Sequence, residues 1–403
     1  MTRTLGRIRK VLALVVSHGF AGTIREISKR LGSRVVGRLA GQQDVVTEFL
    51  FASMRANSPK ANEAPKNTVN WYIPVVGKGS GGHGNIFRFI RALQQLGIES
   101  RIVIVGPNLP KSSKIAADEI RSWFFDLNAD VFLWGEQIPQ AHLGMATEWR
   151  TAYFLRSSEL ETERAYFIQD FEPWFFPHGS LYALAEQTYK FGFKAVTAGS
   201  WLSSLVRDEY GMEAISIGFP PDLSIYDKPS APKLEGTKRV FFYARPPTPR
   251  REFELGILAL DILTTKRPDI KVVFAGWDLS NYKISFKHES LGILREEQLP
   301  NVYSGLDAAL VLSATNLSLL PVDLMASGVP IVSNRGPNVE WLLNESNAYL
   351  CELTPESIAS TLLIALDKSI DTLRRVEKAK KDISKISWAT EAKKTAEFFG
   401  LTT

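Results

Sequence analysis

The stretch that decides the fold is residues 307–343, DAALVLSATNLSLLPVDLMASGVPIVSNRGPNVEWLL. Its apolar run at 308–312 is bounded by polar residues, which is typical of a buried strand. Pro321 stands where the first turn of a helix would begin, and Gly328 with Pro330 ends that helix and begins a second buried strand. The stretch therefore predicts a strand, a polar loop, a short helix and a further strand.

The loop before this helix predicts an anion site. The backbone N–H groups of Ser318, Leu319 and Leu320 come at the start of the helix, where N–H groups have no partner within the helix. They point along the helix axis into one spot, and the positive end of the helix favours a negative charge there. These three residues are therefore expected to bind an anionic group.

The same stretch resembles the nucleotide-sugar-binding signature of GT-B glycosyltransferases in the large retaining family 4, which reads roughly E-G-F-G-L-x-x-x-E-A-M-A-x-G-x-P-V-V. The match is close at residues 325–330, MASGVP. The resemblance places Asp323 at the second glutamate, which in the family bonds the sugar hydroxyls of the nucleoside. Thr315 stands at the first glutamate, so Thr315 and Asn316 offer neutral hydrogen bonds where the family supplies a carboxylate to the donor sugar.

Length and composition set the broad class. The 403 residues are too many for one hydrophobic core and fit two domains. Hydrophobic residues make up 45% of the chain, and no apolar run reaches the length of a membrane span. Cys351 is the only cysteine, which excludes a disulfide within the chain and suits a reducing compartment.

Positive charge is concentrated at the start of the chain. Residues 1–40 carry nine Lys or Arg and one acid, for a net charge of +8, whereas the whole chain carries +5. A nucleic-acid-binding groove would spread its basic residues over a folded face. The local concentration therefore argues against nucleic acid as a partner.

These first forty residues have the pattern of basic amphipathic helices, which can lie in the headgroup layer of an anionic membrane. One alternative is a helical extension packed on the protein. Another is a signal peptide, although its apolar core would be short and interrupted at residues 17–19. Residues 55–68 are typical of a linker. Residues 1–66 are therefore predicted to be an N-terminal extension and linker.

From residue 69 the pattern alternates between strands and helices, which predicts a doubly wound parallel sheet in residues 67–220. A Pro-rich passage at 219–232 is typical of an interdomain hinge, and a second α/β series fills residues 221–386. The expected strands are 69–76, 101–105, 131–133, 143–147, 165–168, 195–198 and 214–217 in the first series, and 239–244, 271–275, 308–312, 331–333 and 348–350 in the second.

The GT-B resemblance assigns roles to these segments. It implies two Rossmann-like domains that face each other across a cleft, an acceptor domain first and a nucleotide-sugar domain second. It also implies a last helix, in residues 387–403, that crosses back to the first domain.

The loop after the first strand, residues 77–84, reads GKGSGGHG and contains G-x-G-x-x-G in two registers. A dinucleotide-binding dehydrogenase is one interpretation, but that fingerprint needs an acid at the end of the second strand, and Gly106-Pro107 stands there. The resemblance implies instead that Gly81 and Gly82 let the backbone approach the donor phosphate and the acceptor. A flexible surface loop is the remaining alternative.

The loop after the first strand of the second domain, residues 244–251, reads ARPPTPRR. The family has G-R-x-x-x-x-K-G here, and the resemblance places Arg245 and Arg250 on the diphosphate. Guanidinium groups form forked hydrogen bonds with phosphate and stabilise the charge that develops on a leaving diphosphate. The alternative is a pair of surface arginines.

Residues 166–176, YFIQDFEPWFF, follow another strand. Together with residues 146–149, ATEW, they resemble the subset of family 4 that transfers L-rhamnose in bacterial surface glycans, such as the S-layer-glycan rhamnosyltransferases. Aromatic rings beside carboxylates suit a sugar, although aromatics at a strand end also pack into cores. Asp170-x-Glu172 has the spacing of a metal-binding motif, but arginines and helix termini do the work of a metal in GT-B enzymes, so no metal is expected.

The resemblance thus implies a retaining glycosyltransferase with dTDP-L-rhamnose as donor, a lipid-linked saccharide as acceptor and no further cofactor. Leu317 beside neutral Thr315 and Asn316 suits a 6-deoxy sugar, which lacks one hydroxyl. In the family the departing diphosphate takes the acceptor's proton, so Asp170 would orient the acceptor or stabilise the oxocarbenium-like centre. The basic N-terminus predicts a cytoplasmic protein held at the inner face of the plasma membrane. A non-catalytic glycan-binding or scaffold protein is the alternative, since the first glutamate is missing.

Overall fold

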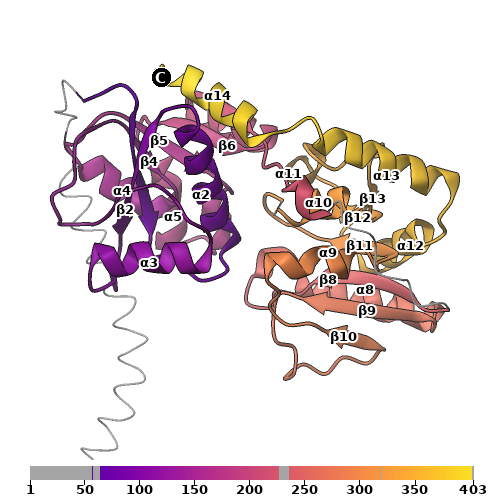
Figure 1. Ribbon diagram of the computed structural model, residues 1–403. Helices are drawn as coiled ribbons and strands as arrows, with labels where there is room; N and C mark the ends of the chain where they lie inside the picture. The colour runs from indigo at the N-terminus through magenta and orange to yellow at the C-terminus, as the bar shows by residue number, and fades with distance from the viewer. Residues whose placement is uncertain (1–56, 58–63, 227–235, 318, 402–403) are drawn as a thin grey trace, which may run out of the picture.

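The computed structural model describes residues 57, 64–226, 236–317 and 319–401. They form two α/β domains, which are coloured purple to magenta and orange to yellow in Figure 1. The expected basic helices of residues 1–40, most of the linker and Ser318 lie outside the described residues. Among the helices that are described, none is both long enough and apolar enough to cross a membrane.

Within the described residues, the first domain is built on a seven-stranded parallel sheet in the order β3-β2-β1-β4-β5-β6-β7. The chain moves outward from β1 to β3, then returns to the middle and runs outward the other way, which is the doubly wound order that the sequence predicted. The strands are β1 (Thr68–Pro74), β2 (Glu99–Val105), β3 (Val131–Leu133), β4 (Ala141–Ala146), β5 (Glu161–Ile168), β6 (Lys194–Ala198) and β7 (Ala214–Ile217).

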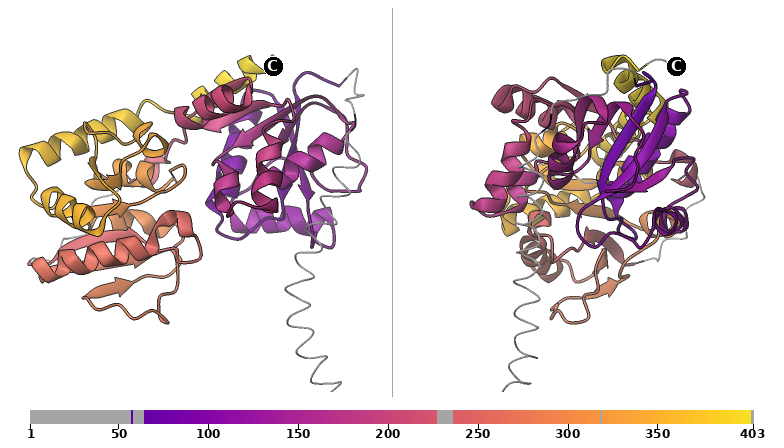
Figure 2. Two further views of the ribbon diagram at one scale, coloured as in Figure 1. Left: turned by 180° about the vertical axis from the view of Figure 1, so that it is seen from behind. Right: turned by 90° about the vertical axis from the view of Figure 1, so that its left-hand side faces the viewer.

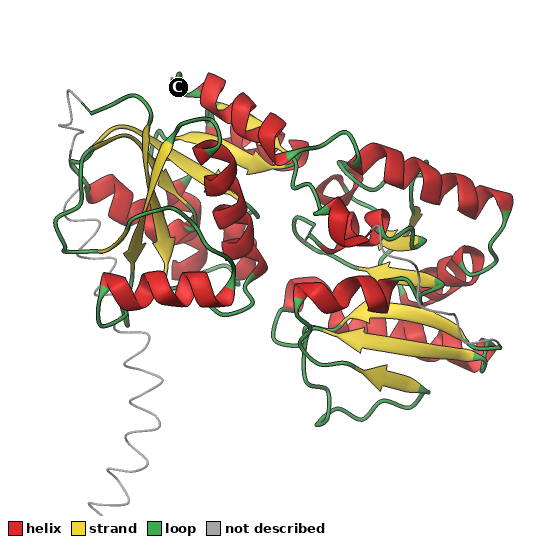
Figure 3. Cartoon of the chain, viewed as in Figure 1, coloured by secondary structure: helices red, strands yellow, loops and turns green. Residues whose placement is uncertain are grey.

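Helices cover both faces of this sheet, as the red ribbons on either side of the yellow strands show in Figure 3. A hydrophobic core lies under each face, and in one of them Trp71 packs edge-on against Phe89 and Phe167, with ring centroids 6.1 and 5.6 Å away. The helices are α2 (Gly81–Gln94), α3 (Ser113–Trp123), α4 (Trp149–Ser157), α5 (Ser180–Thr188) and α6 (Ser200–Tyr210), with a 3-10 turn η1 (Glu172–Phe175).

The second domain, in its described part, has a six-stranded parallel sheet in the order β10-β9-β8-β11-β12-β13. Its central strands are buried along their length, as continuous apolar runs in a parallel sheet should be. The strands are β8 (Lys238–Tyr243), β9 (Ile270–Ala275), β10 (His288–Ser290), β11 (Ala308–Val311), β12 (Ile331–Asn334) and β13 (Tyr349–Cys351). The sequence predicted all of them except β10.

The helices of the second domain again lie on both faces of the sheet. They are α7 (Leu223–Tyr226), α8 (Phe253–Lys266), α9 (Leu299–Tyr303), α10 (Leu320–Ala326), α11 (Pro337–Glu340), α12 (Pro355–Ala365) and α13 (Ile370–Ile383), with 3-10 turns η2 (Pro249–Arg251) and η3 (Glu296–Gln298). Pro321 stands in the first turn of α10, and Gly328 follows the end of that helix with φ +69°.

The last helix, α14 (Trp388–Phe398), leaves the second domain and lies on the first, against α2 and β7. Figure 2 shows it from behind as the yellow helix above the purple domain. The Trp388 ring lies 6.4 Å from Phe89 and 6.0 Å from Phe219, and Ala392 and Phe399 belong to the core of the first domain. The chain therefore passes between the domains twice, before α7 and before α14.

Candidate functional site

Residues from both domains meet where the carboxyl ends of the two sheets face each other. Asp170 follows β5, and Thr315 and Asn316 follow β11. The Asp170 carboxylate accepts hydrogen bonds from the Thr315 hydroxyl (Oδ2 to Oγ1, 2.8 Å) and from the Asn316 backbone N–H (Oδ1 to N, 2.9 Å). Its neighbour Phe171 donates a third hydrogen bond, from its backbone N–H, at 2.8 Å. One carboxylate thus joins the domains, at a contact we call the seam.

The Asp170 side chain is well shielded, since the residue is only 8% exposed. Burial raises the pKa of its carboxyl above the ordinary value of 3.8, because a charge is less stable away from water. The charges of Arg251 and Arg250 and the two hydrogen bonds from the second domain oppose that effect. The ionised carboxylate therefore depends on groups that the other domain supplies.

Asn316 is a second link across the seam and is fully buried. Its side-chain amide donates to the backbone carbonyls of Gln169 and Ala198 in the first domain, at 3.0 and 2.8 Å. The amide oxygen accepts from the indole N–H of Trp341 at 2.9 Å. Since every polar atom of this side chain has a partner, Asn316 fixes the loop after β11 against the ends of β5 and β6.

Two arginines of the 244–251 loop reach the seam. The Arg250 guanidinium lies 3.9 Å from the centre of the Phe175 ring in the first domain, and its Nε lies 3.5 Å from Asp170 Oδ2. Arg251 donates to the Ser313 hydroxyl and to the Asn316 carbonyl, and its Nη2 lies 4.0 Å from Asp170 Oδ2. Arg250 therefore spans the seam, whereas Arg251 mainly supports the loop of its own domain.

Arg245 lies beside them, with Nη1 3.4 Å from the Tyr243 hydroxyl and its guanidinium 5.9 Å from the Trp277 ring. Its charge lowers the pKa of both Arg250 and Arg251, although burial is the larger cause for each. Within the described residues, the Nε atoms of Arg245 and Arg250 are buried and make no hydrogen bond. Arg245, Arg250 and Arg251, hereafter the arginine cluster, thus place three positive charges and unused donors beside the negative charge of Asp170.

The glycine loop approaches the seam from the first domain. Gly81 is the first residue of α2, and a methyl group on it would lie 4.0 Å from the Leu319 side chain in the second domain. A methyl group on Gly82 would lie 3.5 Å from Gln169 Nε2, which also donates to the Gly82 carbonyl at 3.3 Å. Gly81 therefore stands close to the loop that begins α10, and Gly82 lies against Gln169, the residue before Asp170.

The remaining expected residues lie around α10. Leu319 precedes the helix and Leu320 is its first residue, with no side chain capping the start. Asp323 is half-buried one turn later, near enough to Tyr303 to raise the pKa of that phenol, although burial is the main cause. Leu317, expected as an apolar wall for the sugar, is 6% exposed and packs in the core of the second domain.

Comparison with known proteins shows which family this chain belongs to. Residues 77–198 match the N-terminal domain of WsaF, and residues 238–363 match its C-terminal domain. The O-antigen biosynthesis protein RfbC of Myxococcus xanthus is 33% identical over 340 residues, which cover 80% of this chain and 26% of that protein. The chain belongs to the family with WsaF domains, since it carries both of them. It spans about a quarter of the length of this curated relative.

Solved structures confirm the GT-B fold. A glycosyltransferase from Rickettsia africae superimposes with a TM-score of 0.60 at 12% identity, covering 84% of this chain and 98% of that one. Sucrose-phosphate synthase from Thermosynechococcus elongatus gives 0.64 at 11% identity, covering 83% and 98%. Anabaena HepE in complex with UDP and glucose gives 0.63 at 13% identity, covering 82% and 99%. At these identities the likeness establishes the fold alone.

Half of the aromatic residues in the 166–176 run, namely Tyr166, Phe167 and Phe171, are buried in the core of the first domain. Tyr166 and Phe167 are at most 1% exposed, and Tyr166 stacks on Tyr189 at 5.6 Å. Trp174, in contrast, is 46% exposed and faces Trp201 with ring centroids 5.6 Å apart. Of the expected sugar platform, Trp174 offers ring surface to solvent, and Trp201, which was not expected, lies beside it.

Glu172 does not join Asp170 in a shared site. Its carboxylate accepts from the Trp149 backbone N–H at 2.7 Å and from the Tyr166 hydroxyl. Burial first, and then the charge of Glu148, raise the pKa of Glu172 well above its ordinary value of 4.5. Glu172 therefore holds the start of α4 in place, and the two carboxylates of the Asp170-x-Glu172 motif bond different partners.

A Glu172→Gln variant is expected to remove part of the pH dependence of stability. Because the folded-state pKa of Glu172 is raised, the folded protein loses free energy of unfolding as the pH rises from about 4.5 through that pKa. Glutamine carries no titrating proton, so the stability of the variant relative to wild type should increase as the pH rises above about 4.5. Urea unfolding across this range measures the effect, with the exposed Glu397→Gln as control. An unchanged pH slope would contradict the prediction.

Sequence reasoning missed Arg251 and Trp341. The sequence does not show that Arg251, next to Arg250, supports the loop after β11. Trp341 stands near the end of a predicted helix, where an aromatic residue is common. The importance of Trp341 shows only in its contact with the first domain. Gly199 of that domain has φ +85°, and a methyl group on it would lie 2.6 Å from the Trp341 ring. Trp341 therefore packs directly on the backbone of the first domain.

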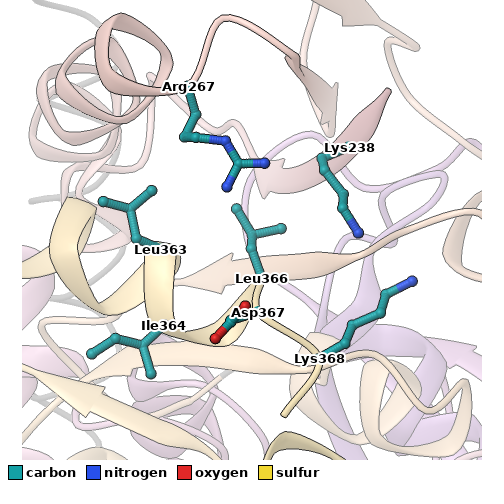
Figure 4. Close-up of a pocket in the computed structure, with 7 residues that line it drawn as sticks. All are labelled: Lys238, Arg267, Leu363, Ile364, Leu366, Asp367 and Lys368. Atoms are coloured by element: carbon teal, nitrogen blue, oxygen red, sulfur yellow. The ribbon is translucent and has the colours of Figure 1, made fainter. Parts of the chain in front are cut away.

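A separate hollow of about 580 Å³ lies in the second domain (Figure 4). It opens where β8 begins, whereas the seam lies where the parallel strands end, so the two are at opposite edges of the sheet. Arg267 pairs there with Asp269, and both Lys238 and Lys368 pair with Asp307. Its lining residues are Lys238, Arg267, Leu363, Ile364, Leu366, Asp367 and Lys368.

Proposed function

We propose that this glycosyltransferase transfers L-rhamnose from dTDP-L-rhamnose to a lipid-linked saccharide, with retention of configuration, in the assembly of a surface glycan. The observation that carries the proposal is the arginine cluster, whose buried, unused N–H groups at the seam suit a diphosphate. WsaF domains belong to the S-layer glycan rhamnosyltransferase family, and RfbC is an O-antigen biosynthesis protein. HepE in complex with UDP and glucose supports a nucleotide sugar as donor.

In the proposed reaction, the bond between the anomeric carbon and the diphosphate breaks while the acceptor oxygen forms a bond to that carbon. The acceptor hydroxyl proton passes to a diphosphate oxygen on the same face of the sugar, so no separate protein base is needed. Arg245 and Arg250 would stabilise the negative charge that develops on the leaving group. Asp170 would orient the acceptor or stabilise the positive charge at the anomeric carbon.

The acceptor side is proposed to include Trp174 and Trp201. The two rings lie on the first domain, and Trp174 follows Asp170 by four residues in the turn whose Phe175 contacts Arg250. An exposed ring beside a seam of charged groups can pack on the C–H face of a pyranose while the hydroxyls find polar partners. The pair therefore suits a saccharide that enters from the first domain.

The donor is tested by a transfer assay with EDTA present, since the arginine cluster is proposed to supply the positive charge that a metal would otherwise supply. We expect dTDP-L-rhamnose to be preferred over UDP-glucose and UDP-galactose. A hexose brings one more hydroxyl, which costs about 1–3 kcal/mol if it stays unpaired. NMR of the product should show a retained anomeric configuration. Preferred use of a UDP-hexose would refute the rhamnose assignment, and an inverted product would refute retention.

A second candidate is a non-catalytic glycan-binding or scaffold protein. It is favoured by one observation: the residue at the family's first glutamate is Thr315, and its hydroxyl is already bonded to Asp170. Calorimetry with dTDP and the transfer assay separate the two candidates. Tight dTDP binding without turnover of any donor would support the scaffold.

The protein is further proposed to be cytoplasmic and peripheral at the inner face of the plasma membrane, bound through residues 1–40, whose net charge is +8. Binding to vesicles of anionic phospholipid should weaken as salt rises, because Lys and Arg near a charged surface are screened. Deleting residues 1–40 should abolish vesicle binding and leave transfer to a soluble acceptor analogue intact. If the full chain ignores anionic vesicles at low salt, the packed-extension interpretation is favoured.

A further inference from the structure

The Asp170 carboxylate lies among groups that are suited to a bound anion. A hydroxyl (Thr315), a backbone N–H (Asn316) and two guanidinium groups (Arg250 and Arg251) all approach it from the second domain. Phe171 supplies the only one of its hydrogen bonds described here that comes from the first domain. A negative side chain of one domain is therefore held mainly by two loops of the other, whose donors suit an anion.

The two arginines balance the charge of Asp170 without bonding to it closely. Their nitrogens lie 3.5 and 4.0 Å from Oδ2, whereas a charge-assisted hydrogen bond from nitrogen to carboxylate is about 2.7–2.9 Å long. The short contacts of the carboxylate go to neutral donors, Thr315 and Asn316. The arginine cluster therefore keeps donors for another anion while Asp170 stays beside it.

A diphosphate bound by the arginine cluster would lie close to this carboxylate, and two anions repel each other strongly where water is scarce. Burial already makes the ionised form of Asp170 costly, which its raised pKa reflects. The least costly response is for the arginines to turn to the diphosphate and for the carboxylate to leave Thr315 and Asn316. Those two groups then become available to the donor sugar.

We infer that Asp170 is an intramolecular counter-ion of the arginine cluster, which holds the seam together until a diphosphate displaces it. The inference rests on the proposed function and adds a sequence of events to it. Asp170 is a positioning residue before the donor binds, since it keeps the Thr315 and Asn316 loop closed. After the donor binds, the same carboxylate is free to meet the acceptor hydroxyl or the sugar.

The test compares the affinity for a diphosphate with the rate of transfer. Isothermal titration with inorganic pyrophosphate and with dTDP is carried out on the full chain as wild type and as Asp170→Asn. Asparagine keeps the shape and the acceptor for the Asn316 N–H but removes the charge. Both ligands should bind the variant about tenfold more tightly, since a repelling charge is gone, while kcat for transfer should fall. Asp269→Asn, at the opposite edge of the second domain, is the matched control.

Thr315→Val tests the same contact from the other domain, so the result does not depend on the folding of one variant. It removes the hydroxyl that holds Oδ2 and should tighten pyrophosphate binding about threefold to fivefold, the weight of one hydrogen bond. A merely structural Asp170 would give folded variants that bind pyrophosphate equally well or less well, and that result would overturn the inference. If wild type binds neither ligand at millimolar concentration, the proposed function itself fails.

Discussion

Replacing Arg250 by alanine is expected to lower kcat/KM about 100- to 1,000-fold, the usual effect of removing one preorganised group that stabilises a developing charge. The guanidinium lies at the seam, 3.9 Å from Phe175, and it carries a buried Nε without a hydrogen bond. Arg245→Ala should have an effect of the same size, because its Nε is also buried and makes no hydrogen bond. Most of the loss should be in kcat, since the charge on the leaving diphosphate grows as the bond breaks.

Controls separate this effect from a general loss of charge or structure. Arg121→Ala removes an exposed arginine that pairs with Asp118 and Asp126 in the first domain and should leave transfer unchanged. Arg251→Ala should lower the melting temperature as well as the activity, because it removes one hydrogen bond to the Ser313 hydroxyl and one to the Asn316 carbonyl. Activity within threefold of wild type in both Arg245→Ala and Arg250→Ala would remove these arginines from the diphosphate site.

A Gly199→Ala substitution is expected to reduce transfer by about 100-fold, because it displaces one domain against the other. The residue has φ +85°, where an L side chain is strained, and the new methyl group would lie 2.6 Å from the Trp341 ring. Trp341 would have to move, and it would then lose the hydrogen bond from its indole N–H to Asn316. Misplacing reacting groups by about 1 Å can cost about 100-fold in rate.

The matched control is Gly211→Ala at the other end of α6. Gly211 also has a positive φ, +66°, but a methyl group there would meet nothing within 4 Å. Its variant therefore measures the cost of a side chain at a positive φ without the clash, in the milder left-handed region with ψ 19° rather than the 163° of Gly199. Steady-state kinetics and thermal unfolding of both variants, and of Gly199→Ala combined with Trp341→Ala, decide the matter. If Gly199→Ala loses no more activity than Gly211→Ala, the contact with Trp341 is not important for transfer.

The fold could be predicted from the sequence because its strands are short, continuous apolar runs between turn residues. Buried strands such as β2 and β11 must be apolar on both faces, which leaves a signal that needs no knowledge of the partner strand. The missed strand, β10, reads HES and is mostly exposed at the sheet edge. An edge strand buries few of its side chains, so the hydrophobic pattern of the sequence does not predict it.

The site could be predicted only in part. Residues that follow strand ends gather at one edge of a parallel sheet, so loops carrying Asp170, Arg250 and Thr315 were open to prediction one domain at a time. The pairing of Asp170 with Thr315 and Asn316 joins positions about 145 residues apart and depends on how two separate domains meet. No local pattern encodes that orientation. The role of Arg251 was hidden for the same reason.

The position of α14 has a consequence for how the protein is made. Ala392, Phe399 and Leu401 complete the core of the first domain, yet they are translated after the whole of the second. While the chain is still on the ribosome, the face of the first domain that α14 covers therefore stays exposed, although the strands of that domain have already emerged. A nascent fragment that stops before Trp388 presents that face to chaperones or to other chains. Completion of the N-terminal half is thus tied to the synthesis of the last residues described here.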